Sequence, residues 1–555
     1  MEIRNMFGKQ PLLLRILVYF LLVSGSIVFS LPFVWMVCTS VKVDRELFPE
    51  KLTIFPKTPN AIEQSPYVDR EYYKDAVKES QNEYIDVFSK IIRKSGFALP
   101  EHVHQERLVR EMAKGLVKRF NTILPPDVWE QGAGVVEQKA ENMVNEEMLR
   151  GILENVYRRL LFGQIRIRDH NVEEEELLPG APFVERYDVL TPETARLVET
   201  YDTGTSCALV KYDFTRGNTV RIEQTCSTTI DLRNLHRIQL YFRPDDNWHR
   251  LTCYIEKMGK LYKSVRPFYM GNFEWGILTY QEPGPEDKSN KIKTWTLIKE
   301  IAQGDSYVHD PHKIKISFEL KKSSQIQAWI GKLIRNYQIT LDHIPIWRYT
   351  ATSLYLVILN VALSVFSCSL VAYAIARLNW PGRNFCFLLM LATMMVPWQV
   401  TMIPSFLIWK RLGAYNTLIP LWLGSAFAAP FSVFLLRQFL KGIPKDLEEA
   451  ARIDGCSYFQ IYWHIMLPLV KPTLAVIAIG AFLGAWNNFM GPLIYVADQR
   501  LYPLAFGLFA FGVQVGNHPA LTMSGAFIMT VPIIVAFFFA QRYFIQGVTL
   551  TGIKG

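Results

Sequence analysis

The residues of this chain that are best placed for chemistry lie in a short polar segment between two long apolar stretches. It contains Glu448, Glu449, Arg452 and Asp454 and ends at Gly455. A mostly apolar chain retains such an exposed polar helix when a partner in the cytosol binds it. The expected chemistry is therefore ion pairing and docking, although composition alone favours a simple amphipathic connector.

The same segment has the signals of two helices joined by a turn. Pro444 suits the first turn of a helix, and the carboxylates after it lie near the positive end of the helix dipole. Gly455 suits the stop position, where φ is often positive. Ser457 and Gln460 have the spacing of a capping box for a second helix, which Pro468 interrupts. The sequence thus predicts helix, turn and helix at a membrane surface.

Four polar, uncharged side chains lie inside apolar stretches. Such groups are costly in hydrocarbon unless they find a partner or face water. Two interpretations carry equal weight: these side chains line a passage for a hydroxyl-rich solute, or they hydrogen-bond neighbouring helices. No Asp, Glu, Lys or Arg lies inside the five later stretches, which disfavours coupling to an ion gradient. The four residues are Asn360, Gln399, Asn487 and Asn488.

No cofactor or metal site is recognisable. The Gly-Lys pairs at 8–9, 259–260 and 331–332 are not followed by Ser or Thr, so the chain has no phosphate-binding loop. No cysteine spacing resembles a zinc site. The net charge of +9 forms no single basic cluster, which makes nucleic-acid binding a poor interpretation. Cys207, Cys226 and Cys253 allow at most one internal disulfide, or are equally well explained as small buried residues.

Six charge-free apolar stretches are long enough to cross a bilayer, which takes roughly 20 helical residues. The apolar core of the first is too long for a signal peptide and is followed by no obvious cleavage site, so we interpret it as an anchor. Basic residues gather in the short loops of one side, which places that side and both termini in the cytosol. The stretches are Ile16–Val41, Tyr349–Ala376, Asn384–Trp409, Leu412–Leu436, Pro472–Ala497 and about Leu521–Gln541.

These stretches divide the chain into residues 1–60, an insertion at 61–340 and a membrane core at 341–555. The insertion lies outside the cell membrane under this orientation. Its part at about 61–175 has helical periodicity, and its part at about 185–340 alternates with period two, which predicts a β-sandwich. Ile238, Leu240 and Phe242 form one such alternation. Its aromatic residues are expected mostly to fill the core, with a sugar-stacking platform as the alternative; they include Trp248, Tyr254, Tyr262, Phe273, Trp275 and Tyr280.

Several motifs resemble those of one family of membrane proteins. The stretch Ile443–Gly455, ending in Leu467-Pro468, is similar to the EAA region of carbohydrate (maltose-type) importer permeases driven by ATP-binding-cassette (ABC) ATPases. Pro32–Met36, Trp486–Phe489 and Gly547–Gly555 resemble further parts of that family. The likeness covers roughly the first 60 and the last 210 residues. The large insertion departs from the family, whose first outer loop is usually short.

This resemblance implies a type I importer permease of six transmembrane helices in the bacterial inner membrane. Its partners are then a cytosolic ATPase dimer that binds ATP, a second permease subunit, an extracytoplasmic solute-binding protein, a carbohydrate and lipids. The resemblance does not account for the insertion; we expect it to dock the binding protein, in preference to holding polysaccharide near the pore or covering the second permease. The loop at about 441–471 then couples to the ATPase through Glu448, Glu449, Ala450, Ala451, Asp454, Gly455, Leu467 and Pro468.

Two other classes of function stay open. The first is a membrane-anchored carbohydrate-active enzyme whose outer carboxylates cleave glycans, although catalytic pairs are recognised by separation in space and no sequence spacing singles one out. An anchor needs one span, so six spans and an exposed polar helix are superfluous for that role. The second is a gradient-driven transporter, for which intramembrane ionisable groups are missing.

Overall fold

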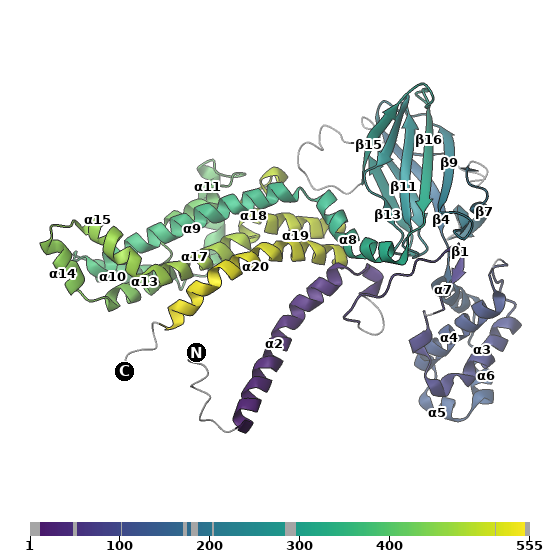
Figure 1. Ribbon diagram of the computed structural model, residues 1–555, viewed down its shortest axis with the longest axis horizontal. Coiled ribbons are helices and arrows are strands. Elements are labelled where there is room, and N and C mark those ends of the chain that lie inside the picture. The colour runs from purple at the N-terminus through teal and green to yellow at the C-terminus, as the bar shows by residue number, and fades with distance from the viewer. Residues whose placement is uncertain are drawn as a thin grey trace.

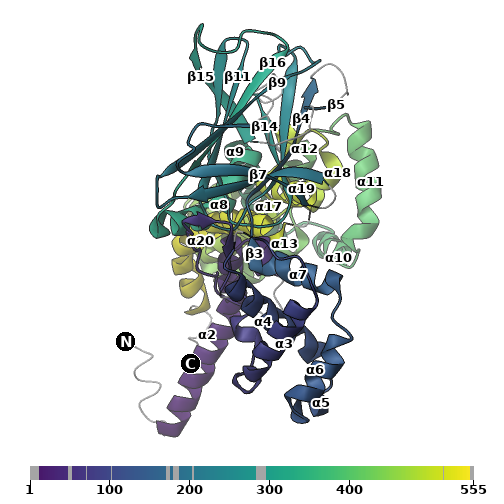
Figure 2. The ribbon, with the colours of Figure 1, turned by 90° about the vertical axis from the view of Figure 1, so that its right-hand side faces the viewer.

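The computed structural model describes the 555-residue chain except residues 1–11, 48–52, 71, 102, 170–174, 179–186, 203–204, 283–295, 517 and 550–555. Figure 1 shows an elongated bundle of helices, a β-sheet structure beyond one end of it, and a group of short helices beside the sheet. Figure 2 shows the same arrangement turned by a right angle.

The bundle contains several helices that are apolar enough to lie in a membrane. By length and composition, four helical segments of the described chain can cross a bilayer, or up to six if two bent pairs each form one span. The chain is thus a multi-pass membrane protein. The principal helices are α2 (Leu12–Ser40), α9 (Ile346–Arg377), α10 (Arg383–Thr393), α11 (Trp398–Arg411), α13 (Pro430–Gly442), α17 (Lys471–Trp486), α19 (Leu504–Val515) and α20 (Pro519–Thr549).

Three of the expected spans are broken rather than continuous. The stretch 412–436 contains α12 (Ile419–Trp422) and a 3₁₀ turn before α13 begins at Pro430. The stretch 472–497 ends one helix at Trp486 and begins α18 (Met490–Tyr495) after a three-residue gap. A bend of 99° separates α10 from α11, where Pro397 precedes the second helix. Proline at a helix start and asparagine at a helix end favour such breaks over a straight span.

The first part of the insertion is a small helical group with its own apolar core. Its amphipathic helices bury residues at helical spacing, as in Phe88, Ile91 and Ile92 or in Leu149, Ile152 and Val156. The helices are α3 (Glu83–Lys94), α4 (Gln105–Ile123), α5 (Pro126–Glu130), α6 (Ala133–Glu141) and α7 (Glu146–Val156).

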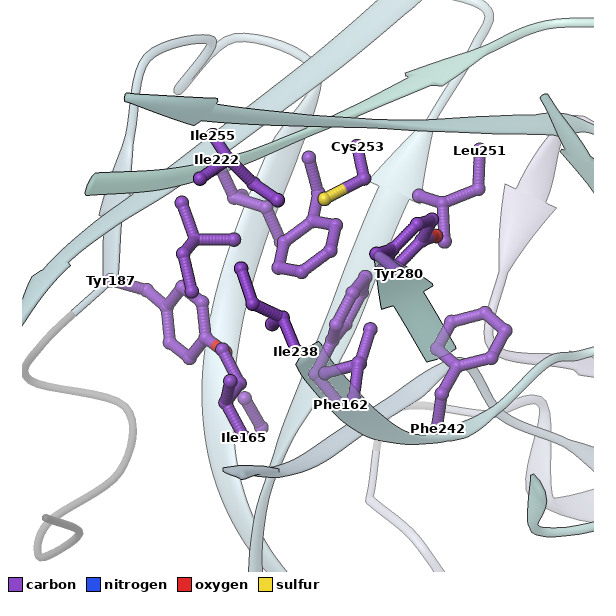
Figure 3. Packing of buried hydrophobic residues seen from close by; sticks show 14 of the residues in the cluster. Phe162, Ile165, Tyr187, Ile222, Ile238, Phe242, Leu251, Cys253, Ile255 and Tyr280 are labelled. Carbon is purple, nitrogen blue, oxygen red and sulfur yellow. The ribbon is translucent and has the colours of Figure 1, made fainter. Parts of the chain in front are cut away.

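The second part of the insertion is sheet-rich. Two mainly antiparallel sheets face each other and are joined through a parallel pair, β14 (Gly276–Gln281) with β15 (Thr296–Gln303). The alternation of Ile238, Leu240 and Phe242 on β10 (Leu235–Arg243) is confirmed, because all three are buried in one core cluster. Figure 3 shows Ile238 and Phe242 in this cluster. The other strands used below are β3 (Tyr157–Arg158), β4 (Leu161–Asp169), β5 (Glu175–Leu177), β7 (Ala195–Asp202), β8 (Thr205–Asp213), β11 (Arg250–Lys257) and β16 (Lys313–Lys321).

Candidate functional site

The turn of the polar segment has the structure that the sequence predicts. The helix α14 (Asp446–Ile453) ends in a Schellman motif, in which Cys456 N–H donates to the Ala451 carbonyl at 2.9 Å and Gly455 N–H to the Arg452 carbonyl at 3.1 Å. Gly455 has a φ of +83°, a conformation that residues with a Cβ rarely adopt. The helix begins at Asp446, so Pro444 precedes the first turn instead of lying in it.

The second helix is capped as expected but is longer than expected. Ser457 and Gln460 form both hydrogen bonds of a capping box at the start of α15 (Tyr458–Ile461). A π-helical turn at Tyr462–Met466 then leads into α16 (Leu467–Leu469), so Pro468 lies inside the helix. A π turn tolerates proline because it widens the backbone near the residues that the ring would crowd. The bend of 81° comes two residues later, before α17.

One face of α14 is seated against the bundle, and the other is open. Ala451 is 7% exposed and packs with residues of α9 and α13. Ile453 is 86% exposed and Leu447 is 44% exposed, and both Glu449 and Ala450 are exposed. Exposed apolar side chains on a polar helix favour a surface that a protein partner covers.

Arg377, the last residue of α9, fixes α14 to the bundle. Its guanidinium donates to the carbonyls of Leu440 and Ile443, the latter at 2.6 Å, at the end of α13. Its Nε lies 3.1 Å from the Glu448 carboxylate, and the two side chains are only 4% and 17% exposed. Burial raises the pKa of Glu448, and the charge of Arg377 opposes that rise. The ion pair therefore ties α9, α13 and α14 into one unit.

Sequence reasoning missed Arg377, which counts there only as one of many basic residues on the cytosolic side. It also assigned no role to the aromatic side chains near the turn. Tyr458, Phe459 and Trp463 are half or more exposed next to α14, and they extend its apolar surface. The predicted residues Leu467 and Pro468 lie at the far end of the second helix, where Leu467 is half-buried and Pro468 is exposed.

Asn360, one of the four polar residues of the apolar stretches, bonds to a helix break. Its amide nitrogen donates to the carbonyls of Leu356 at 2.7 Å and Leu421 at 3.2 Å, and its oxygen accepts the hydroxyl of Ser425. The side chain thus stabilises the junction where α12 passes into the 3₁₀ turn.

The two neighbouring asparagines have similar contacts. Asn487 donates to the Leu483 carbonyl at 3.0 Å, and Asn488 accepts the Gly491 N–H at 2.9 Å at the start of α18. Gln399 differs, because it lies exposed on α11. Hydrogen bonding to backbone groups at helix ends thus accounts for three of the four residues, and a passage for solute stays a prediction.

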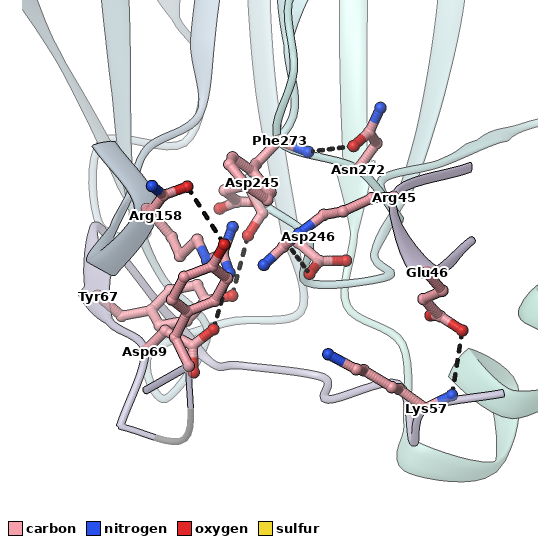
Figure 4. A network of polar contacts seen from close by, with 12 residues as sticks. Arg45, Glu46, Lys57, Tyr67, Asp69, Arg158, Asp245, Asp246, Asn272 and Phe273 are labelled. Atoms are coloured by element: carbon pink, nitrogen blue, oxygen red, sulfur yellow. Dashed lines mark hydrogen bonds and ion pairs between the residues drawn. The ribbon is translucent and has the colours of Figure 1, made fainter. Parts of the chain in front are cut away.

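A buried polar cluster joins the bundle to the insertion (Figure 4). The guanidinium groups of Arg45 and Arg158 lie 3.9 Å and 3.8 Å from the centre of the Phe273 ring. Arg45 pairs with Asp246 at 3.4 Å, and Arg158 pairs with Asp69 at 2.8 Å. Because Arg45 lies in the short turn Asp44–Glu46 after α2, and Arg158 lies on β3 at the start of the sheet-rich part, the cluster connects α2 to the insertion.

A second set of contacts connects α2 to α8 (Gln325–His343), which leads from the sheet into α9. We call this set and the polar cluster together the joint. Lys332 of α8 forms a buried ion pair with Glu46. Asn336 donates to the carbonyls of Ser40 at 2.9 Å and Lys42 at 2.7 Å, which are open acceptors at the end of α2. The joint is therefore built from charged and polar contacts on both sides of the insertion.

The described residues of the insertion contain no metal cluster and no disulfide. No group of three or more His, Cys, Asp or Glu side chains there could hold a metal ion. Cys207, Cys226 and Cys253 are free and buried, which agrees with the interpretation as core residues. Of the six aromatic residues singled out by the sequence, Trp248, Phe273 and Tyr280 are buried. Tyr254, Tyr262 and Trp275 are partly exposed.

Comparison with known proteins finds similarity in the membrane core. A family model described as the binding-protein-dependent transport system inner membrane component matches residues 367–550. The arabinooligosaccharides transport system permease protein AraQ of Halalkalibacterium halodurans is 41% identical over 209 residues, which are 38% of this chain and 75% of that protein. AraQ of Bacillus subtilis is 36% identical over 209 residues, or 38% of this chain and 74% of that protein.

Other relatives and a solved structure are also similar. The alpha-glucoside transport system permease protein AglG of Rhizobium meliloti is 32% identical over 228 residues, which are 40% of this chain and 60% of that protein. The crystal structure of a bacterial ABC transporter that imports the acidic polysaccharide alginate has a chain 27% identical to this one. The match covers 38% of this chain and 79% of that chain, with a TM-score of 0.33. More than half of the present chain lies outside each of these matches.

Proposed function

This chain belongs to the family of binding-protein-dependent transport system inner membrane components, and we propose that it forms half of the pathway by which an ABC importer takes up a carbohydrate. It is a permease subunit, and the ATPase of such an importer is a separate subunit. The names of its relatives support the class of cargo, since they transport arabinooligosaccharides and alpha-glucosides. The observation that carries the mechanism is the half-exposed helix α14, held to the bundle by Arg377.

The exposed face of α14 is the coupling surface in this proposal. Glu449, Ala450, Ile453 and Asp454 enter a cleft of the ATPase, and Gly455 supplies the turn that makes the helix protrude. When the ATPase dimer closes on ATP, the seated helix moves with it. Because Arg377 and Glu448 join α14 to α9, that movement reaches the bundle as a displacement of whole helices.

The same assignment orients the chain. Figure 1 shows α14 and α15 at one end of the bundle and the sheet at the other end. With α14 in the cytosol, residues of about 61–340 lie outside the inner membrane and both termini lie inside. A second permease subunit and lipids then cover the exposed apolar surface of α2, and a solute-binding protein delivers the cargo from the outer side. The tail near Thr549–Gly555 is expected, by analogy with the family, to reach toward the ATPase; its residues 550–555 lie outside the described residues.

Affinity purification of the full chain tests this proposal. The tagged chain is isolated in detergent from cells that express the neighbouring transporter genes, and the bound ATPase is measured. Wild type retains the ATPase, whereas Glu449→Lys and Gly455→Pro lose it and also lose ATP-dependent uptake. Lys441→Ala is the matched control, because Lys441 is exposed at the same end of the bundle but lies on α13. Normal uptake by Glu449→Lys and Gly455→Pro contradicts the proposal.

A further inference from the structure

An open cavity lies on the outer face of one sheet of the insertion, away from the core between the sheets. Its volume is about 350 Å³, which falls within the range of small-molecule sites, roughly 300–1,000 Å³. It is lined by residues of β4, β5, β8, β10 and β14, with Asp202 from the end of β7. The lining residues used below are Gly163, Gln164, Arg166, Asp202, Gln239, Tyr241 and Trp275.

The cavity has an aromatic wall. The rings of Tyr241 and Trp275 are stacked, with centroids 5.2 Å apart and an angle of 21° between their planes. Tyr241 is 45% exposed and the nearby Ile277 is 55% exposed, so this surface is not part of the core. Stacked rings with open faces bind flat apolar surfaces, such as the C–H faces of a sugar ring.

The aromatic wall is held rigidly. Trp275 Nε1 donates to Asp202 at 3.1 Å, and Asp202 is itself paired with Arg243 at 2.8 Å. Gly163 lies beneath the stack, where a Cβ would meet the Trp275 ring at 3.1 Å and the Tyr241 carbonyl at 3.1 Å. A preformed wall lowers the entropy cost of binding a ligand.

Polar side chains at paired positions of neighbouring strands lie beside the two rings. Arg166 of β4 pairs across the strands with Gln239 of β10, and Gln239 pairs with Thr279 of β14. Gln164 is exposed two residues before Arg166. These amide and guanidinium groups offer donors and acceptors of the kind that bind sugar hydroxyls.

We propose that this cavity binds a sugar unit of a neutral oligosaccharide, with a ring face on the Tyr241–Trp275 stack and hydroxyl groups on Gln164, Arg166 and Gln239. The site binds and does not cleave, because Asp202 is the only carboxylate among the described lining residues and glycosidases use a pair. The proposal rests on the proposed function for one point, the location of the insertion outside the membrane. It gives the insertion a role in collecting cargo near the pore.

Binding of oligosaccharides to the full chain in lipid nanodiscs, without ATPase or binding protein, tests the inference. The probes are arabinopentaose, maltopentaose and, as an acidic comparison, an alginate pentasaccharide, followed by calorimetry. We expect saturable binding of a neutral probe, weakened roughly tenfold or more by Trp275→Ala and by Tyr241→Ala. Trp275→Phe keeps a ring and should retain most of the affinity. Tyr254→Ala should not change it, because Tyr254 lies on β11 of the other sheet.

Two outcomes overturn the inference. One is the absence of saturable binding of every probe by a folded chain; the other is binding that both alanine variants leave unchanged. If the first outcome is found and a separate pull-down shows that Trp275→Ala weakens capture of the solute-binding protein, the surface is assigned to protein docking instead. A failure of the coupling proposal looks different, because Glu449→Lys then leaves uptake intact and has no effect on glycan affinity.

Discussion

The Arg377 guanidinium lies 3.1 Å from the Glu448 carboxylate and also binds the carbonyl ends of α13. One buried cation thus forms an ion pair with a carboxylate on the proposed coupling helix and donates hydrogen bonds to two backbone carbonyls at the end of the preceding helix. Removal of one partner of a buried pair leaves the other charge uncompensated, at a cost of about 3–5 kcal/mol.

We therefore expect Arg377→Ala to loosen α14 from the bundle while the sheet-rich region stays folded. ATP-driven uptake should fall tenfold or more. If α14 still reaches the ATPase but no longer moves α9, the purified complex should retain ATP hydrolysis that is no longer stimulated by cargo. Uptake into vesicles and ATP hydrolysis, both measured on the same preparation, show whether uptake is lost while hydrolysis is retained. Lys441→Ala on α13 is the control, and an equal loss of uptake in both variants contradicts the role given to Arg377.

Gly455→Ala should destabilise the turn after α14 through backbone strain alone. The φ of +83° at this position disfavours a Cβ by about 1 kcal/mol, although open space surrounds the site. Gly442→Ala is a matched control, because its Cβ also meets open space but its φ is not positive. Hydrogen exchange of amides 450–460 should rise in Gly455→Ala only. Equal exchange in the two variants would falsify the strain argument.

Local signals in the sequence predicted the local structure well. The Ser457–Gln460 capping box, the stop at Gly455 and the buried alternation on β10 are all confirmed, because each depends on residues close together in the chain. The π turn before Pro468 was not foreseen. Proline normally ends a helix, and only the surrounding packing shows that the helix continues.

The contacts that assemble the site could not be predicted in the same way. Arg377 meets its acceptors on α13 across 63 and 66 positions, and Lys332 meets Glu46 across 286 positions. One sequence gives no measure of such distances. For the same reason, the stacking of Trp275 on Tyr241 could not be predicted: the alternation on β10 puts Tyr241 on the face opposite the core residues, but only the fold brings Trp275 beside it.

The buried groups Asp245 and His249 should make the stability of the insertion depend on pH in opposite directions. Burial raises the pKa of Asp245 to about 6, although the Tyr212 hydroxyl donates to it at 2.7 Å. Its folded form therefore keeps a proton that the unfolded chain releases. The stability from this group is complete below the ordinary carboxyl pKa and is lost as the pH rises through about 6, by about 3 kcal/mol in total.

The histidine acts in the other direction. Burial lowers the pKa of His249 to about 4, and the neutral ring fits its site because Nδ1 accepts the Ser323 N–H while Nε2 lies 2.6 Å from the Ile62 carbonyl. The stability that His249 contributes to the fold is complete above the ordinary histidine pKa and is lost as the pH falls towards about 4. Between pH values of about 4 and 6, the stability lost through Asp245 as the pH rises is largely offset by the stability gained through His249.

Asp245→Asn should remove the pH dependence of stability that comes from Asp245 and leave the one that comes from His249. We expect its unfolding temperature to rise more steeply with pH between about 4 and 6 than that of wild type. Tryptophan fluorescence during heating of the full chain in nanodiscs reports the transition. Asp188→Asn, at an exposed position on the insertion, should keep the wild-type profile. A flat profile for Asp245→Asn would show that these two groups do not set the pH dependence.

The joint at Glu46 and Lys332 should transmit force between the insertion and the bundle. Both side chains are nearly inaccessible to water, so Lys332→Met leaves the Glu46 carboxylate buried without its cation, at a cost of about 3–5 kcal/mol. We expect faster hydrogen exchange in α8 and at the end of α2, where Asn336 binds the open carbonyls. The ATPase should still co-purify, because α14 lies at the opposite end of the bundle (Figure 1). Lys322→Ala, which breaks the more exposed pair with Glu63, is the control and should leave exchange in α8 unchanged. Unaltered exchange in Lys332→Met, or loss of the ATPase together with it, would contradict a joint that acts only at the outer end.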